Sequence, residues 1–197
     1  MKFAGILILT LTLLAVGGPT LAHEETDWMT LNQPSAAHRK LDALEGKWKT
    51  TTKIWMAGPD APPGLSEGTS TFEWILDGRF LEERTDSVLS FPGENGELTD
   101  VPYSGRGLLG YDNVRNMYVN TWVDSLSTYI SYSKGQFSPD GKKLVLYGEM
   151  DEPARGVYGR MLRLETDFKT PDHHVFTMYD LNLGENYKVM EIVYERI

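Results

Sequence analysis

Apolar and polar residues alternate with a period of two along most of the chain from Gly46 onward. This period is typical of β-strands, because successive side chains of a strand point to opposite faces of the sheet. Gly, Pro, Asn and Asp residues divide the pattern into about ten short runs. The predicted strands span residues 46–56, 69–76, 79–89, 103–111, 117–124, 128–134, 143–149, 157–166, 174–180 and 187–196.

The segments between these runs favour antiparallel pairing. A connection between parallel strands needs roughly a dozen residues or more, usually a helix, and most of these segments are shorter. We therefore expect an all-β protein with an antiparallel sheet, folded either as a sandwich or as an up-and-down barrel. Segments 57–64 and 91–102 are longer and rich in Pro and Gly, and we expect both to lie outside the sheet.

One short helix is predicted before the first strand. Ser35 is a favourable N-cap residue, and Leu41 and Leu44 follow at helical spacing within residues 36–45. Gly46 then suits the left-handed conformation that ends many helices.

The first and last strands carry a pair of side chains that can close a barrel. Trp48 is the first residue on the apolar face of its strand, whereas lysines occupy the opposite face. Arg196 shares a face with Tyr194 in the last strand. If these strands pair, the Arg196 guanidinium can stack on the Trp48 ring as a cation–π contact. We assign structural roles to Gly46, Trp48 and Arg196, which would close one end of the barrel.

The first 22 residues have the features of a secretory signal peptide. Lys2 precedes an apolar run, and Thr20-Leu21-Ala22 matches the small-x-small cleavage pattern. The apolar run is shorter than the ~20 residues that a membrane helix needs. We expect a signal peptide at 1–22, a flexible leader at 23–33 and one domain at 34–197. The mature protein would begin at His23, lack a membrane span, and be exported to the bacterial periplasm or the medium.

Composition excludes several functions. The chain has 28 Asp and Glu residues against 19 Lys and Arg, a net charge of −9, so its surface repels nucleic acid and anionic lipid headgroups. It has no cysteine, which rules out thiol catalysis and thiolate metal sites. We predict no metal and no cofactor.

Two motifs have simpler interpretations than the ones their letters suggest. Residues 105–110 spell the dinucleotide fingerprint G-x-G-x-x-G, but no helix follows to hold a pyrophosphate. We interpret these glycines as permitting a bend or close strand packing. In the pair His173-His174, the second residue shares a face with Phe176 and can point inward. A single inward histidine can ligate haem, so a haem-binding barrel remains an alternative to an ordinary buried histidine.

Several segments together resemble a known family. They are L-D-A-L-E-G-K-W, W-I-L-D-G-R-F-L-E, G-L-L-G-Y-D-N, Y-V-N-T-W-V-D-S, G-E-M-D-E-P, H-V-F-T-M-Y and M-E-I-V-Y-E-R. In this order, from about Leu41 to Arg196, they resemble the exported bacterial family known as domain of unknown function 1579. Gly46-x-Trp48 with a terminal arginine is also similar to the calycin signature of lipocalins. The resemblance implies a closed calycin-like barrel of about ten strands and brings no established activity.

The width of such a barrel favours an internal ligand. Eight strands already suffice to hold one small molecule, and about ten enclose more space. We therefore expect the barrel to bind a small apolar or amphipathic molecule. The predicted contacts are Trp74, Glu82, Arg84, Trp122, Asp124, His174, Met178 and Tyr194. Two alternatives stay open: an isomerase or hydrolase that uses the same cavity, and a filled barrel that binds a protein partner.

Overall fold

The computed structural model describes residues 28–92, 98–152 and 156–197. The predicted signal peptide, 1–22, and the first part of the leader, 23–27, lie outside the described residues.

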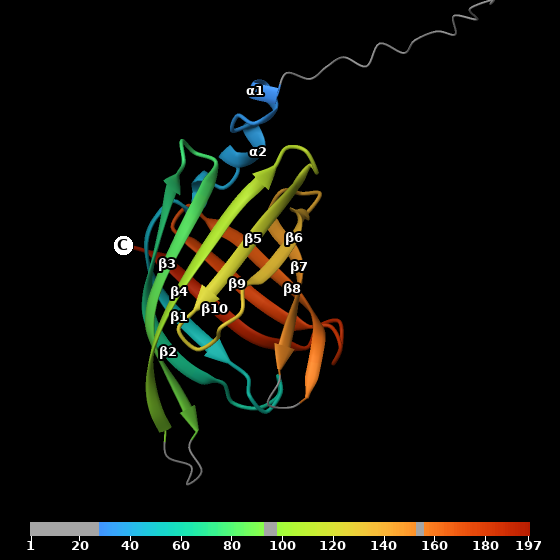
Figure 1. Cartoon of the computed structure of the whole chain (residues 1–197). Coiled ribbons are helices and arrows are strands. Elements are labelled where there is room, and N and C mark those ends of the chain that lie inside the picture. Colours follow the sequence, from blue (N-terminus) through green and yellow to red (C-terminus); the bar gives the residue numbers. More distant parts are fainter. Residues whose placement is uncertain (1–27, 93–97, 153–155) are drawn as a thin grey trace, which may run out of the picture.

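Ten antiparallel strands of the described residues form one closed barrel, in the order β1-β10-β9-β8-β7-β6-β5-β4-β3-β2 (Figure 1). The strands are β1 (Gly46–Ile54), β2 (Gly64–Ile75), β3 (Phe80–Pro92), β4 (Leu98–Asp112), β5 (Met117–Asp124), β6 (Ser131–Phe137), β7 (Lys143–Glu152), β8 (Val157–Thr170), β9 (His173–Asp180) and β10 (Lys188–Arg196). Each strand pairs with its neighbour in sequence, and β1 pairs with β10 to close the cylinder. The prediction of an all-β, up-and-down barrel is confirmed.

The predicted loop at 91–102 is largely strand, so that expectation was wrong. β3 and β4 stay paired from Val88–Pro102 to Pro92–Leu98. Pairing of β3 with β2 ends at Ser87, and pairing of β4 with β5 ends at Gly105. The outer part of the hairpin is therefore a two-stranded ribbon that extends past the barrel (Figure 1). A proline is tolerated there because that edge of β4 has no further strand to which it must donate a hydrogen bond.

The predicted N-terminal helix is shorter than expected. Residues 36–45 form one turn of α-helix, α2 (Ala36–Arg39), and a 3₁₀ turn, η1 (Asp42–Leu44). Another turn, α1 (Trp28–Leu31), lies in the predicted leader. The Asn113 amide, in the turn between β4 and β5, donates hydrogen bonds to the Leu31 and Gln33 carbonyls. These contacts attach the end of the leader to the barrel.

The α2–η1 segment covers one end of the barrel, which we call the capped end. Leu41 and Leu44 are buried there against Trp48, Leu81, Tyr118, Leu144 and Tyr194. The Tyr118 hydroxyl donates a 2.9 Å hydrogen bond to the Ala37 carbonyl. This apolar cluster and its backbone contact explain why so short a helical segment is held in place.

Trp48 and Arg196 lie at the centre of the capped end. Trp48 is 1% exposed, and its indole N–H donates a 2.8 Å hydrogen bond to the Leu44 carbonyl. The Arg196 guanidinium carbon lies 4.1 Å from the ring centroid, so the expected cation–π contact is present. The same guanidinium donates to the carbonyls of Ala43 and Glu45. It also occupies the space beside Gly46, whose φ of +125° and absent side chain permit this approach.

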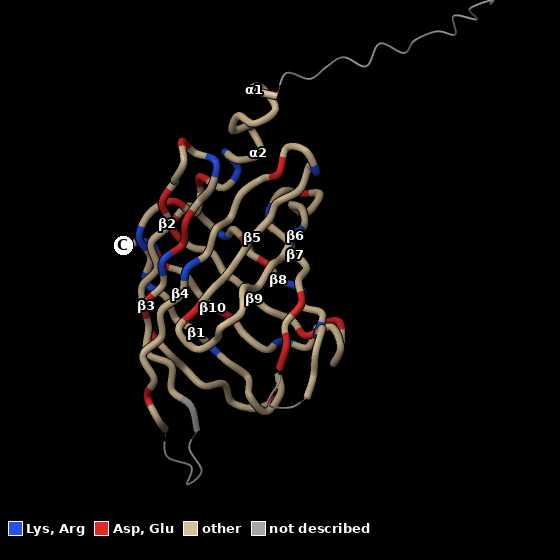
Figure 2. Tube along the Cα trace, in the orientation of Figure 1, with Lys and Arg blue, Asp and Glu red and all other residues tan. Residues whose placement is uncertain are grey.

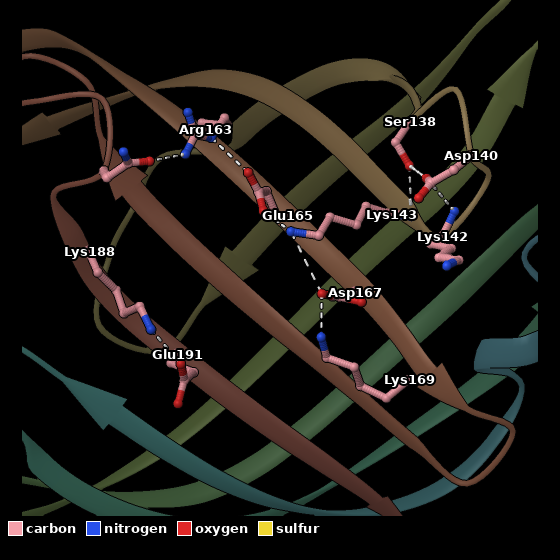
Figure 3. Close-up of polar contacts among 11 residues, drawn as sticks. Ser138, Asp140, Lys142, Lys143, Arg163, Glu165, Asp167, Lys169, Lys188 and Glu191 are labelled. Carbon is pink, nitrogen blue, oxygen red and sulfur yellow. Dashed lines mark hydrogen bonds and ion pairs between the residues drawn. The ribbon is translucent and has the colours of Figure 1, made fainter.

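Charged residues of both signs are interspersed along the strands (Figure 2), and several form ion pairs on the outer surface of the barrel. Figure 3 shows part of this surface, where Lys143 contacts Glu165 and Asp167 across β7 and β8. Exposed pairs of this kind contribute little stability individually. Among the described residues, no helix has the length and apolar character needed to cross a membrane.

Candidate functional site

A cavity of about 270 Å³ lies inside the barrel, toward the end opposite α2. The residues that line the cavity show where it lies. Asp124 is the last residue of β5, whereas Tyr118, near the start of β5, contacts α2. Met190 lies near the start of β10, whose other end carries Arg196. The side chains Tyr129 and Tyr132 also line it and are solvent-exposed, which places its mouth near the β5–β6 connection.

The cavity wall is mainly apolar and aromatic, with a few polar groups. Its apolar side chains include Trp122, Leu162, Phe176, Met178, Met190 and Ile192. Its polar side chains include Glu83, Tyr103, Asn120, Asp124, Ser133 and Tyr194. Small-molecule sites commonly combine an apolar wall with a few polar groups that orient the ligand.

A smaller space of about 70 Å³ continues from the cavity toward the capped end. The two spaces share Glu83, Asn120, Leu164, Phe176 and Tyr194 in their walls. The smaller one ends against Leu44, Phe72 and His174. The interior is therefore filled at the capped end and hollow toward the opposite end.

Glu83 is the central polar residue of the interior. Its Oε1 accepts hydrogen bonds from Ser70 Oγ at 2.7 Å, Thr85 Oγ1 at 3.0 Å and the Tyr194 hydroxyl at 3.1 Å. No described residue donates a hydrogen bond to Oε2, and Glu83 lines both the cavity and the smaller space. Burial raises the pKa of Glu83 above its usual value, although the three hydrogen bonds act in the opposite direction.

Two tyrosine hydroxyls lie near this carboxyl group. Burial, and then the neighbouring Glu83, raise the pKa of Tyr194 well above its usual value. Burial raises the pKa of Tyr103 to about 12, and its hydroxyl accepts a 3.1 Å hydrogen bond from the Trp122 indole N–H. Both hydroxyls therefore stay protonated at neutral pH and can donate hydrogen bonds.

The glycine motif at 105–110 provides room for Trp122. Gly107 pairs with Trp122 across β4 and β5. A Cβ atom at Gly107 would lie 2.9 Å from the indole, and one at Gly105 would overlap it. The two glycines thus let the Trp122 ring lie flat against β4. They accommodate a side chain of the cavity wall rather than a bend or close strand packing.

The structure brings together some of the predicted ligand contacts. Trp122, Asp124, Met178 and Tyr194 line the cavity, and His174 lines the smaller space next to it. Sequence reasoning missed Glu83, Tyr103, Asn120 and Ser133. A signal for Glu83 was present, because it shares strand parity with Leu81 and Leu89, both of which are buried.

Glu82 and Arg84 do not line the cavity. Both lie on the outer face of β3, where the Arg84 guanidinium contacts Glu82 at 2.5 Å and Glu73 at 3.6 Å. The polar end of a ligand inside the barrel cannot reach them, because adjacent residues of a strand point to opposite faces.

Trp74 lies at the capped end and lines neither space. Its indole N–H donates a 3.0 Å hydrogen bond to Asp42 Oδ1, and the Arg39 guanidinium carbon lies 5.1 Å from its ring centroid. Trp74 therefore helps to hold the α2–η1 segment on the barrel.

His174 is enclosed by aromatic rings. It is 2% exposed, stacks on Tyr194 at 4.2 Å between centroids and meets Trp48 edge-on at 4.4 Å. Its Nδ1 has no hydrogen-bond partner among the described residues. Burial, and then the charges of His173 and Arg196, lower the pKa of His174 to about 3.

These surroundings do not fit an axial haem ligand. The space beside His174 is about 70 Å³, far too small for a macrocycle, and the Trp48 and Tyr194 rings cover the imidazole. Within the described ranges, no group of three or more His, Asp or Glu side chains is placed to hold a metal ion.

Comparison with solved structures supports the barrel fold. The crystal structure of Rv2717c from M. tuberculosis is similar with a TM-score of 0.55 and 15% sequence identity, over 84% of this chain and 99% of that chain. A redesigned β-barrel, b11L5F_LGL, has a TM-score of 0.38 and 13% identity, over 81% of this chain and 96% of its own. Of these two, the likeness to Rv2717c supports the barrel, and at 15% identity it concerns the fold alone.

Comparison of the sequence identifies the family. None of the curated proteins searched matches the chain. The family model described as "Protein of unknown function (DUF1579)" matches residues 33–196, a range that includes all ten described strands. The chain therefore belongs to the DUF1579 family.

Proposed function

We propose that this protein is an exported carrier or sensor that binds a small, largely apolar molecule inside its barrel. The observation that carries the proposal is the 270 Å³ cavity, whose wall combines Trp122, Phe176 and Met178 with a few polar groups. A barrel whose side chains filled its interior would offer no such space.

The volume of the cavity limits the size of the ligand. An apolar protein cavity of about 150 Å³ holds benzene, so this cavity suits a molecule somewhat larger than a single aromatic ring. The flexible thioethers of Met178 and Met190 can adjust to ligands of different shape. We therefore expect binding of compact molecules and exclusion of cofactors as large as haem.

Calorimetric titration with 2-phenylethanol, a neutral probe of suitable size, tests this proposal. Ser133 lines the cavity, so Ser133→Phe places a ring in it and should abolish binding. Ser104 is exposed on the outer face of β4, so Ser104→Phe is the matched control and should bind as the wild type does. Failure of the wild type to bind both this probe and its amine analogue, 2-phenylethylamine, or undiminished binding by Ser133→Phe, would refute the proposal.

One observation favours an enzyme as a second candidate. A buried carboxyl group with a raised pKa that faces a cavity, as Glu83 does, is suited to general acid–base catalysis of an isomerisation or a hydrolysis. The molecules extracted from the wild type and from Glu83→Gln distinguish the two functions. A carrier variant contains the molecule of the wild type or none, whereas an enzyme variant accumulates an unconverted substrate that the wild type does not hold.

A further inference from the structure

The charged side chains that line the cavity all have one sign. Glu83, Asp124 and Glu149 belong to its lining, and no Lys, Arg or His is found among the described residues that form it. The barrel's outer surface is different, because there carboxylates such as Glu165 and Glu191 are paired with lysines. An anionic ligand would find no compensating positive charge inside the barrel.

Two polar groups of the cavity lack partners. Ser133 is 3% exposed, and its hydroxyl has no hydrogen-bond partner among the described residues. Glu83 uses Oε1 for its three hydrogen bonds, no described residue donates to its Oε2, and the residue lines the cavity. Buried polar groups in native proteins are nearly always paired, so these two indicate where the polar group of a ligand binds.

An aromatic ring, that of Trp122, lines the same cavity as Glu83. Glu83 pairs with Gly107, and Gly107 pairs with Trp122, so the three residues form one row across β3, β4 and β5 and share the same face of the sheet. Because Gly107 has no side chain, the indole of Trp122 fills the position between β4 and the cavity. The face of an indole attracts cations more strongly than any other side-chain ring.

We infer that the ligand is a small organic cation, a protonated amine with an apolar body, whose ammonium group lies between the Glu83 carboxylate and the Trp122 ring. This inference rests on the proposed function and specifies the charge of its ligand. The ammonium group would donate hydrogen bonds to Glu83 Oε2 and the Ser133 hydroxyl, while the body contacts Met178 and Phe176. The carboxylate and the ring together offset the cost of removing the cation from water.

Three probes of nearly equal size test the inference by calorimetry. They are 2-phenylethylamine, which is cationic at neutral pH, 2-phenylethanol, which is neutral, and phenylacetate, which is anionic. We expect the amine to bind at least tenfold more tightly than the alcohol, and phenylacetate to bind most weakly. Equal affinity for amine and alcohol, or tighter binding of phenylacetate, would overturn the inference and leave the proposed function intact. If none of the three probes binds, both the inference and the proposed function are refuted.

Adjacent glutamates provide a matched pair of variants. Glu83→Gln keeps an oxygen to accept the bonds from Ser70, Thr85 and Tyr194, and it should abolish the preference for the amine without weakening the alcohol. Glu82→Gln, on the outer face, should leave both affinities unchanged. If Glu83→Gln does not fold, Ser133→Ala serves instead and should reduce affinity for the amine alone, by about threefold. An undiminished preference for the amine in folded Glu83→Gln, or in Ser133→Ala where that variant replaces it, would contradict the placement of the ammonium group beside these side chains.

Discussion

The Tyr194 hydroxyl donates a 3.1 Å hydrogen bond to Glu83 Oε1 and so connects β10 with β3 across the interior of the barrel. These strands are not neighbours, since β1 and β2 lie between them in the closed sheet. The bond marks the boundary between the two parts of the interior. On one side the core around Trp48 is filled, and on the other the cavity is open to a ligand.

Glu83 should make stability depend on pH in a direction unusual for a carboxyl group. Its pKa in the folded state is raised above the unfolded value of 4.5, so the folded state binds more protons between these two values. Its contribution to the free energy of unfolding is therefore present at low pH and falls as pH rises through that window, by at most ~1.4 kcal/mol per pH unit. Denaturant titrations of the wild type and Glu83→Gln between pH 4 and 8 measure this.

The comparison isolates Glu83 from the other groups that face it. Tyr103 and Tyr194 keep their protons throughout this range, because their pKa values are raised. Asp124 and His174 are present in both proteins, so their contributions cancel when the two free energies of unfolding are subtracted. The stability of the wild type relative to Glu83→Gln should decrease as pH rises, and parallel curves would contradict the raised pKa.

His174 should destabilise the protein in acid. Its pKa is about 3 in the folded state against 6.5 unfolded, so the unfolded state binds the proton more tightly between these values. The stability associated with neutral His174 is complete above pH 6.5 and is lost as pH falls toward 3, by about 1.4 kcal/mol per unit. His174→Phe retains a ring beside Trp48 and Tyr194 and should lose less stability between pH 7 and 4.5. His173→Phe, on the outer face, should retain the acid sensitivity, and equal losses in both variants would contradict this role.

Removal of Trp48 should damage the capped end. Trp48→Ala eliminates a fully buried ring together with its contact to Arg196, and we expect a loss of ~3–5 kcal/mol in the free energy of unfolding. Trp28 is 68% exposed, so Trp28→Ala should change stability by less than about 0.5 kcal/mol. Urea denaturation measures both, and a loss below about 1 kcal/mol for Trp48→Ala would show that Trp48 does not close the barrel.

Gly107 should be required for the position of Trp122. A methyl group at this residue would lie 2.9 Å from the indole, so Gly107→Ala should displace the ring and reduce 2-phenylethanol affinity at least tenfold. We also expect a loss of ~1–3 kcal/mol in stability from overpacking. Gly64 is also a strand glycine, but a methyl group there would lie no closer than 3.6 Å to its nearest neighbour. Gly64→Ala should therefore preserve affinity, and an equal effect of the two variants would contradict the role of Gly107.

Export is a prediction from the sequence, and the mass of the isolated protein tests it. The protein isolated from the periplasm or medium of its producing bacterium should lack residues 1–22 and begin at His23. Intact mass spectrometry with N-terminal sequencing decides this. A chain that retains residues 1–22 would contradict cleavage.

The architecture could be predicted from sequence because a period of two is visible in every strand. The turn residues indicate how many strands there are. Trp48 and Arg196 lie on the inward faces of the first and last strands, which indicates that these two strands pair to close the barrel. The ribbon at the end of β3 and β4 could not be predicted, because its Pro and Gly content is that of a loop. Pairing within the hairpin, a tertiary effect, overrides local preference there.

The candidate site was harder to predict for physical reasons. Glu82, Glu83 and Arg84 are three consecutive charged residues, and charge alone does not show which of them points inward. Parity relative to Leu81 and Leu89 identifies Glu83, but it requires an unbroken strand between them. Trp74 has the inward parity and still lies outside the cavity, because depth along the barrel depends on strand register and tilt. Sequence patterns do not contain that information.

Native mass spectrometry of the protein isolated from its own producing bacterium tests the central claim most directly. We predict a species heavier than the denatured chain by the mass of one small molecule, present in the wild type and in Ser104→Phe but absent from Ser133→Phe. A wild-type protein without additional mass, or a cargo that Ser133→Phe retains, would contradict the claim that the cavity is the binding site.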